Sequence, residues 1–151
     1  MTSDGHVDGA ELMRKVAAAF EKSDLQPLFD AAHEDIVWKA GSQQEGLFRF
    51  GGEYNNRSGL LLLVASWFTA YTFYRFHPKE IIASGETVWG LFDVGAFFDP
   101  KRDGEPKKHI TLEMAFRWRL KDGKVIEHQG FFDTVSLLVQ MGVMVHPSLQ
   151  P

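Results

Sequence analysis

The chain has 151 residues, with 44% hydrophobic and 24% charged residues, which is typical of an ordinary globular protein of one domain. Its formal net charge of −4 and the lack of a dense basic patch disfavour nucleic acid as a partner. It contains no cysteine, which excludes thiolate nucleophiles, disulfides and thiolate metal ligands. Its 13 Phe, 4 Trp and 3 Tyr residues supply enough aromatic surface to fill a core or to line an apolar cavity.

No segment of the sequence predicts a membrane span or a secretion signal. The longest apolar run, Leu60 to Ala65, has six residues, whereas a spanning helix needs about 20. The segment Met1 to Asp8 is polar and lacks the basic and apolar regions of a signal peptide. We therefore expect a single domain over residues 1–151 that resides in the cytoplasm and has no membrane partner.

The first half of the chain has apolar residues at helical spacing, interrupted by one short strand. Asp8 and Glu11 have the spacing of a capping box, and Ser23 with Gln26 offers a second cap. The helix that follows Asn56 is apolar nearly all round, which predicts burial of most of its faces. The predicted elements are a helix over 9–22, a short helix over 25–32, a strand over 36–38 and a helix over 59–71.

From residue 73 onward the period of the apolar residues changes to two, which is typical of strands. Pro78 marks the first of these strands as an edge or bulged strand, and Lys121 to Lys124 forms a tight hairpin turn before the last one. Gly142 ends a short helix that follows the sheet. The predicted elements are strands over 73–84, 87–98, 109–120 and 125–132, then a helix around 135–141.

Two polar segments interrupt this pattern. Gly41 to Gly52 predicts a loop that forms a lid or rim, with a short strand at Leu47 to Phe50, and Asp99 to Lys108 predicts an exposed hairpin loop. Helices that are segregated from an antiparallel sheet make an α+β fold. We therefore expect a cone-shaped, curved antiparallel sheet with three to four helices that close one face around a central cavity.

Alternation within two strands predicts what each face of the sheet contacts. In the strand over 109–120, one face is wholly apolar and is expected to face the helices, while the other carries Glu113 and Arg117, which we interpret as an ion pair. The strand over 87–98 is apolar on both faces, and its outer side carries Trp89, Leu91 and Phe97. Either the C-terminal tail covers that side, or two copies of the chain pack sheet to sheet as a homodimer.

The hairpin from Trp118 to His128 and the residues after it carry a longer pattern. An Asp-Gly-Lys-Val-x-Glu-His hairpin at 122–128 is followed by Asp133, Leu137, Gln140 and Gly142. This pattern resembles that of the SnoaL-like polyketide cyclases, a family within the superfamily of nuclear transport factor 2. The predicted order of helices and strands also matches the family over nearly the whole chain, so the resemblance implies the cone-shaped fold.

The resemblance also implies a chemistry. In the characterised cyclases, the aspartate that matches Asp133 is the acid/base for an intramolecular aldol ring closure, which needs no metal and no nucleotide cofactor. It implies Asp133 as the catalytic residue. Among the other residues, His128 and His109 are the candidates to assist it. From the residues alone, Asp133 also stands where the N-cap of the last helix belongs, and lone histidines in strands are often structural. Both interpretations stay open.

Candidate ligand-binding residues fall into three groups. Tyr54 and Asn56 belong to the expected rim, where they either orient an oxygen of the ligand or form a turn and a helix cap. Gln129 stands where the cyclases tend to have an aromatic residue. The third group lines either the core or the cavity and consists of Trp38, Trp67, Tyr71, Phe116 and Trp118. The histidines lack the short spacings of metal ligands, so no metal is expected.

Two classes of function follow. The first is a cofactor-free cyclase, isomerase or hydrolase that acts through Asp133 on a small hydrophobic carbonyl compound. The second is a non-catalytic ligand-binding or interaction protein of the same fold. An epoxide hydrolase-like enzyme is a further alternative, which is disfavoured because the strand around Leu112 to Phe116 lacks the Arg-x-Asp pair of those relatives. The expected partner is a small hydrophobic molecule, bound by a homodimer.

Overall fold

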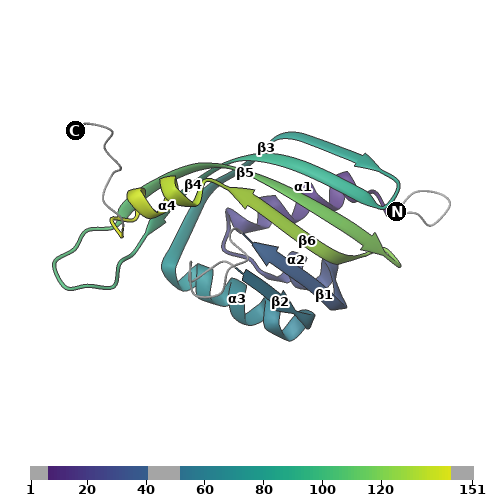
Figure 1. The fold of residues 1–151 in the computed structure, drawn as a ribbon, viewed down its shortest axis with the longest axis horizontal. Helices are drawn as coiled ribbons and strands as arrows, with labels where there is room; N and C mark the ends of the chain where they lie inside the picture. The colour runs from purple at the N-terminus through teal and green to yellow at the C-terminus, as the bar shows by residue number, and fades with distance from the viewer. Residues whose placement is uncertain (1–6, 41–51, 144–151) are drawn as a thin grey trace.

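The computed structural model describes residues 7–40 and 52–143, which fold into four helices and six strands (Figure 1). The elements are α1 Gly9–Phe20, α2 Gln26–Ala31, β1 Ala32–Ala40, β2 Gly52–Asn55, α3 Asn56–Ala70, β3 Tyr71–Ser84, β4 Thr87–Phe98, β5 Lys108–Lys121, β6 Lys124–Phe132 and α4 Thr134–Gln140. The predicted strand at 47–50, most of the predicted lid and the end of the tail fall in residues 41–51 and 144–151, outside the described residues.

The six strands form one curved, unclosed sheet in the order β2-β1-β6-β5-β4-β3 (Figure 1). Neighbouring strands run antiparallel except β1 and β6, which run parallel. α1 lies on the concave side of the sheet against β3 and β4, and α3 lies beside β1 and β2. The predicted α+β class and cone-shaped sheet are confirmed, and the parallel β1–β6 pair is the departure from the expected antiparallel order.

Local signals in the sequence explain where several elements begin and end. Asp8 accepts a hydrogen bond from the Glu11 amide at 3.2 Å and so caps α1, as the capping-box spacing predicts. Asp122 and Gly123 both have positive φ, 53° and 74°, which suits the tight turn between β5 and β6. β3 is an edge strand whose pairing shifts just after Pro78, which confirms the prediction for this strand.

The first half of the chain departs from the prediction at three places. β1 begins at Ala32, where the sequence predicts helix, because Ala32 already pairs with Val125 of β6 and this pairing overrides the local helical spacing. The Ser23 cap is wrong, since the side chain of Asp24 accepts the hydrogen bond from the Gln26 amide. β2 is missing from the prediction because a four-residue strand is too short to show a period.

α3 is less buried than its composition predicts. Leu60, Leu63 and Val64 are buried, but Leu61 and Leu62 are 41% and 76% exposed, so the prediction of burial on most faces is wrong. The buried residues have the i, i+3, i+4 spacing of one helix face, and α3 uses that single face against the core. Neither α3 nor any other helix in the described part of the chain is long and apolar enough to cross a membrane.

The two faces of the sheet divide as the alternation in β4 and β5 predicts. The inner set of β5, which includes Ile110, Leu112 and Trp118, is buried beneath the helices. On the outer face Trp89 and Phe97 are exposed, together with other aromatic side chains of β3 and β6. Homodimer formation through this outer face stays a prediction, which sedimentation equilibrium can test.

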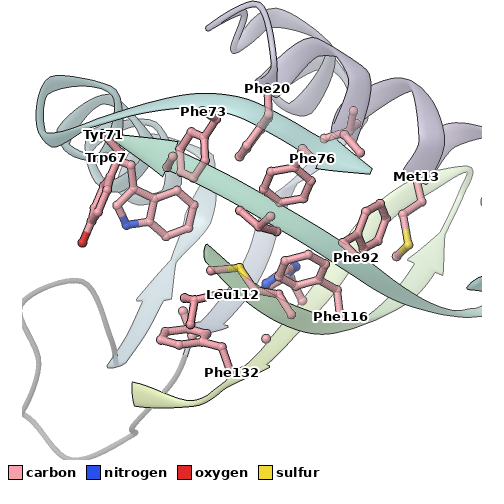
Figure 2. A pocket seen from close by; sticks show the side chains of 18 of the residues that line it. Met13, Phe20, Trp67, Tyr71, Phe73, Phe76, Phe92, Leu112, Phe116 and Phe132 are labelled. Atoms are coloured by element: carbon pink, nitrogen blue, oxygen red, sulfur yellow. The ribbon is translucent and has the colours of Figure 1, made fainter. Parts of the chain in front are cut away.

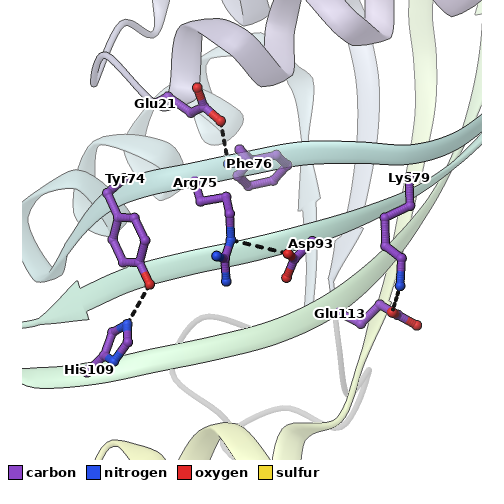
Figure 3. Close-up of polar contacts among 8 residues, drawn as sticks. All are labelled: Glu21, Tyr74, Arg75, Phe76, Lys79, Asp93, His109 and Glu113. Atoms are coloured by element: carbon purple, nitrogen blue, oxygen red, sulfur yellow. Dashed lines mark hydrogen bonds and ion pairs between the residues drawn. The ribbon is translucent and has the colours of Figure 1, made fainter.

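The ion pairs on the outer face have different partners from those predicted (Figure 3). Glu113 pairs with Lys79 of β3 at 2.6 Å, as Figure 3 shows. Arg117 pairs with Glu127 of β6, so Glu113 and Arg117 do not pair with each other. Lys79 reaches Glu113 across the intervening strand β4, and Glu127 lies diagonally across from Arg117 on the neighbouring strand β6. Diagonal neighbours in a sheet lie within reach of long side chains, whereas residues four apart in one strand are about 13 Å apart.

Candidate functional site

The inner face of the sheet and the helices on it border an apolar cavity of about 100 Å³ (Figure 2). Its described wall consists mainly of aliphatic and aromatic side chains and contains no Asp, Glu, Lys or Arg, and His128 supplies its one imidazole. The wall includes five of the residues predicted to line a core or a cavity, which are Trp38, Trp67, Tyr71, Phe116 and Trp118.

His128, on β6, is the buried polar residue of the described chain, with 3% of its surface exposed. Its Nδ1 accepts a hydrogen bond from the indole Nε1–H of Trp118 at 2.9 Å. Its ring lies flat on that of Trp38, with centroids 3.4 Å apart and planes 4° apart, and the Phe116 ring lies 5.3 Å away. These three aromatic side chains hold the imidazole in one orientation at the cavity wall.

Burial lowers the pKa of His128 well below its ordinary value of 6.5, because apolar surroundings disfavour the charged imidazolium. No carboxylate belongs to the described wall to offset that cost. The imidazole is therefore uncharged at neutral pH, and it acts as a hydrogen-bonding group within the apolar wall.

Asp133 lies outside the described cavity wall, at the N-cap of α4. Its Oδ1 accepts a hydrogen bond from the Ser136 amide at 2.9 Å, and the residue is exposed. α4 contributes Leu137 to the wall, and it is tied to β5 by hydrogen bonds between Gln140 and the backbone of Thr111. In this arrangement Asp133 serves as a cap, and its catalytic role stays a prediction that requires the carboxylate to leave the Ser136 amide.

His109 lies on the outer face of the sheet (Figure 3). Its Nε2 shares a hydrogen bond with the Tyr74 hydroxyl, and its ring packs against Phe97 with centroids 5.3 Å apart. The sheet separates His109 from His128, so the structure does not bring the two predicted histidines together. No three His, Asp or Glu side chains within residues 7–40 and 52–143 are grouped as metal ligands would be.

Three other candidate residues do not line the described cavity. Tyr54 packs against the hydrophobic core from β2. Asn56 accepts a hydrogen bond from the Gly59 amide at 2.9 Å, as a cap at the start of α3 does. Gln129 lies on the outer face, where its Oε1 accepts a hydrogen bond from Arg117 at 3.3 Å. Ligand-binding roles for these residues stay predictions, and the contacts that the structure shows for them are structural.

The cavity wall also contains aromatic and aliphatic residues that the sequence patterns do not single out as ligand-binding residues. Figure 2 shows their side chains gathered around the cavity. Strand alternation places the cavity-lining residues of β4 and β5 on the inner face of the sheet. The cavity-lining residues of α1 depend on where this helix crosses the sheet, which alternation does not predict. Examples from α1 and four strands are Met13, Phe20, Phe73, Phe92, Leu112 and Phe132.

A curved sheet that wraps an apolar cavity defines the cone-shaped α+β class, and the sequence matches one family of that class. The family model of the SnoaL-like domain matches residues 13–128, from α1 to His128 in β6. The protein therefore belongs to the SnoaL-like domain family. The match ends before Asp133, so the aspartate on which the implied cyclase chemistry depends lies beyond the matched residues.

Several solved structures share this fold. TerC, co-crystallised with polyporic acid, is 22% identical and has a TM-score of 0.73, over 87% of this chain and 96% of its own. An NTF2-like protein of unknown function from Burkholderia pseudomallei is 21% identical, with a TM-score of 0.72 over 87% and 95%. IdmH of Streptomyces antibioticus, a proposed polyketide cyclase, is 20% identical, with a TM-score of 0.71 over 90% and 99%. At such identities the likeness shows the fold alone. No curated protein matches the chain.

Proposed function

We propose that the protein binds a small, uncharged, hydrophobic molecule in the cavity beneath the sheet. The cavity itself supports this proposal, because about 100 Å³ of space is bordered by apolar side chains with no charged residue in the described wall. In another protein, a dry apolar cavity of about 150 Å³ binds benzene. Small-molecule sites gain affinity from such apolar surface and orientation from a few polar groups, which here means His128.

Filling the cavity is expected to remove the binding site. Ala96 is buried on β4 and belongs to the cavity wall, so the larger side chain of Ala96→Leu occupies ligand space. Because the wall is apolar, benzene is a suitable probe, followed by chemical-shift titration of the labelled protein. We expect Ala96→Leu to weaken benzene binding about ten-fold or more, since it removes apolar contact surface.

Ala115→Leu is the matched control. Ala115 pairs with Leu91 and Phe131 on the outer face of the sheet, so the same substitution there leaves the cavity unchanged. Benzene binding is expected to stay at the wild-type level in this variant. Absence of saturable binding to the wild-type protein contradicts the proposed function.

A second candidate is cofactor-free cyclase or isomerase chemistry on a bound carbonyl compound. Membership of the SnoaL-like family favours it, and so does an uncharged imidazole at the cavity wall, because a neutral histidine can polarise a carbonyl group. The described wall supplies no carboxylate as a base, so proton removal would depend on Asp133 moving from its cap. Epoxide hydrolase-like chemistry lacks such support, because the carboxylates it requires are also missing from that wall.

Asp133→Asn separates the two roles of this residue. Asparagine caps helices about as well as aspartate, so the free energy of unfolding is expected to stay within about 0.5 kcal/mol of wild type. If Asp133 is the base, exchange of the α-protons of cyclohexanone in D₂O, followed by NMR, falls about 100-fold in the variant. Exchange that the wild-type protein does not accelerate over buffer contradicts the catalytic candidate and leaves ligand binding unaffected.

A further inference from the structure

The hydrogen bond from Trp118 decides which nitrogen of His128 carries the proton. An indole N–H is a donor only, so Nδ1 of His128, which accepts that bond, is the unprotonated nitrogen. A neutral imidazole has one protonated nitrogen, and burial keeps this imidazole neutral. Nε2 therefore carries the proton and is a hydrogen-bond donor.

Nε2 of His128 lies beside Gly130 and has no hydrogen-bond partner within the described part of the chain. A Cβ atom on Gly130 would lie 3.2 Å from Nε2, and both residues belong to the cavity wall. A Cβ at this position would also lie 3.4 Å from the Phe116 ring, so any side chain on residue 130 would crowd this donor and cover it. A donor at the wall of an apolar cavity lacks a hydrogen bond when the cavity is empty, and an acceptor on a bound molecule would supply one.

Two features of the wall restrict the molecule that can supply the acceptor. Trp38, which stacks on His128, has a buried Nε1 that also lacks a partner, so this part of the wall offers a second donor. The described wall contains no Lys or Arg to offset the charge of a carboxylate ligand. The molecule that fits is therefore uncharged, mainly apolar, and carries an oxygen acceptor.

We infer that Nε2–H of His128 donates a hydrogen bond to the carbonyl oxygen of an uncharged, mainly apolar ligand in the cavity, where Gly130 has no side chain to cover the donor. The inference rests on the proposed function, because it requires a ligand in the cavity. His128 then determines specificity by donating a hydrogen bond to the ligand. It is not a general base, because Nδ1 already accepts the hydrogen bond from Trp118 and Nε2 keeps its proton. The same bond stabilises negative charge on that oxygen if an α-proton is removed.

Two ligands of the same shape separate this hydrogen bond from the fit to the cavity. Cyclohexanone has a C=O group, which accepts a hydrogen bond, where methylenecyclohexane has a C=CH₂ group, which does not. An NMR titration gives the dissociation constant of each ligand. The methyl group of Gly130→Ala covers Nε2, so we expect the ratio of ketone affinity to alkene affinity to fall about ten-fold in this variant. Steric effects of the methyl group act on both ligands alike and cancel in the ratio.

The outcomes distinguish this inference from the proposed function. If both ligands bind and the ratio is the same in Gly130→Ala and wild type, the inference is overturned and the proposed function stands. If neither ligand binds the wild-type protein, both are overturned. A readout in the wild type covers the case of a misfolded variant: the Nε2 proton resonance of His128 is expected to move downfield with cyclohexanone and not with methylenecyclohexane. An unmoved resonance at saturation overturns the inference.

Discussion

Replacing Phe92 with alanine is expected to lower the free energy of unfolding by about 3–5 kcal/mol. Phe92 is 1% exposed, and its ring packs against Phe76 and Phe116 at centroid distances of 5.5 Å each. Because Phe92 also borders the cavity, the space it leaves adds to an existing void, and the neighbouring strands do not close it. Urea unfolding followed by tryptophan fluorescence measures the loss.

Phe97→Ala is the control for this prediction. Phe97 lies on the same strand, but it faces outward, where it is 41% exposed and contacts Tyr74 and His109. Its replacement is expected to cost about 1 kcal/mol or less, because a partly exposed ring loses less buried surface. Equal losses in the two variants contradict the assignment of the two faces of β4.

Acidification is expected to destabilise the protein through His128, beginning near pH 6.5. In the unfolded chain this histidine takes up a proton at its ordinary pKa of about 6.5, whereas burial lowers its pKa in the folded protein well below that value. Between the two values the unfolded state binds more protons, so stability falls as the pH falls. One histidine that stays unprotonated in the folded state lowers the free energy of unfolding by at most about 1.4 kcal/mol between pH 7.5 and pH 5.5.

His128→Asn is the matched comparison for the pH dependence. The asparagine side chain does not titrate, and its carbonyl oxygen can accept the hydrogen bond from Trp118 in place of Nδ1. The change in the free energy of unfolding from pH 7.5 to pH 5.5 is measured for the variant and for the wild type. The contributions of the other titratable groups cancel when the two changes are subtracted. The same pH response in both proteins contradicts the prediction. In the wild type, an NMR titration that shows His128 protonated at pH 5.5 contradicts it as well.

Local patterns were sufficient to predict most of the fold. The alternation of β5 identifies the buried face of the sheet, because every second residue from Ile110 to Trp118 is apolar and faces inward, and the pairing of β5 with β4 has no bulge that would interrupt the alternation. The capping box at Asp8 and the hairpin turn at Gly123 are equally local, since each depends on the backbone of a few adjacent residues.

β6 shows why such patterns do not place the site residues. The pairing of β5 with β6 shifts between Arg119 and Leu120, where Glu127 and Val125 are the successive partners, so Ile126 is an extra residue in the strand. An extra residue reverses which face the following side chains occupy. Alternation counted from Val125 therefore places Gln129 inside the cone, whereas the structure places His128 there and Gln129 outside.

By itself, the sequence determined the α+β class, the order of the long strands, the inner face of β5 and the resemblance to the SnoaL-like family. Only the tertiary structure decided that His128 and not His109 borders the cavity, and that Asp133 caps α4 outside the described wall. The physical reason is that the order of the strands along the chain and the positions of the helix caps follow from residues that are neighbours in the sequence. The direction of a side chain depends on a bulge, on the parallel pairing of β1 with β6, and on which backbone amide lies within reach.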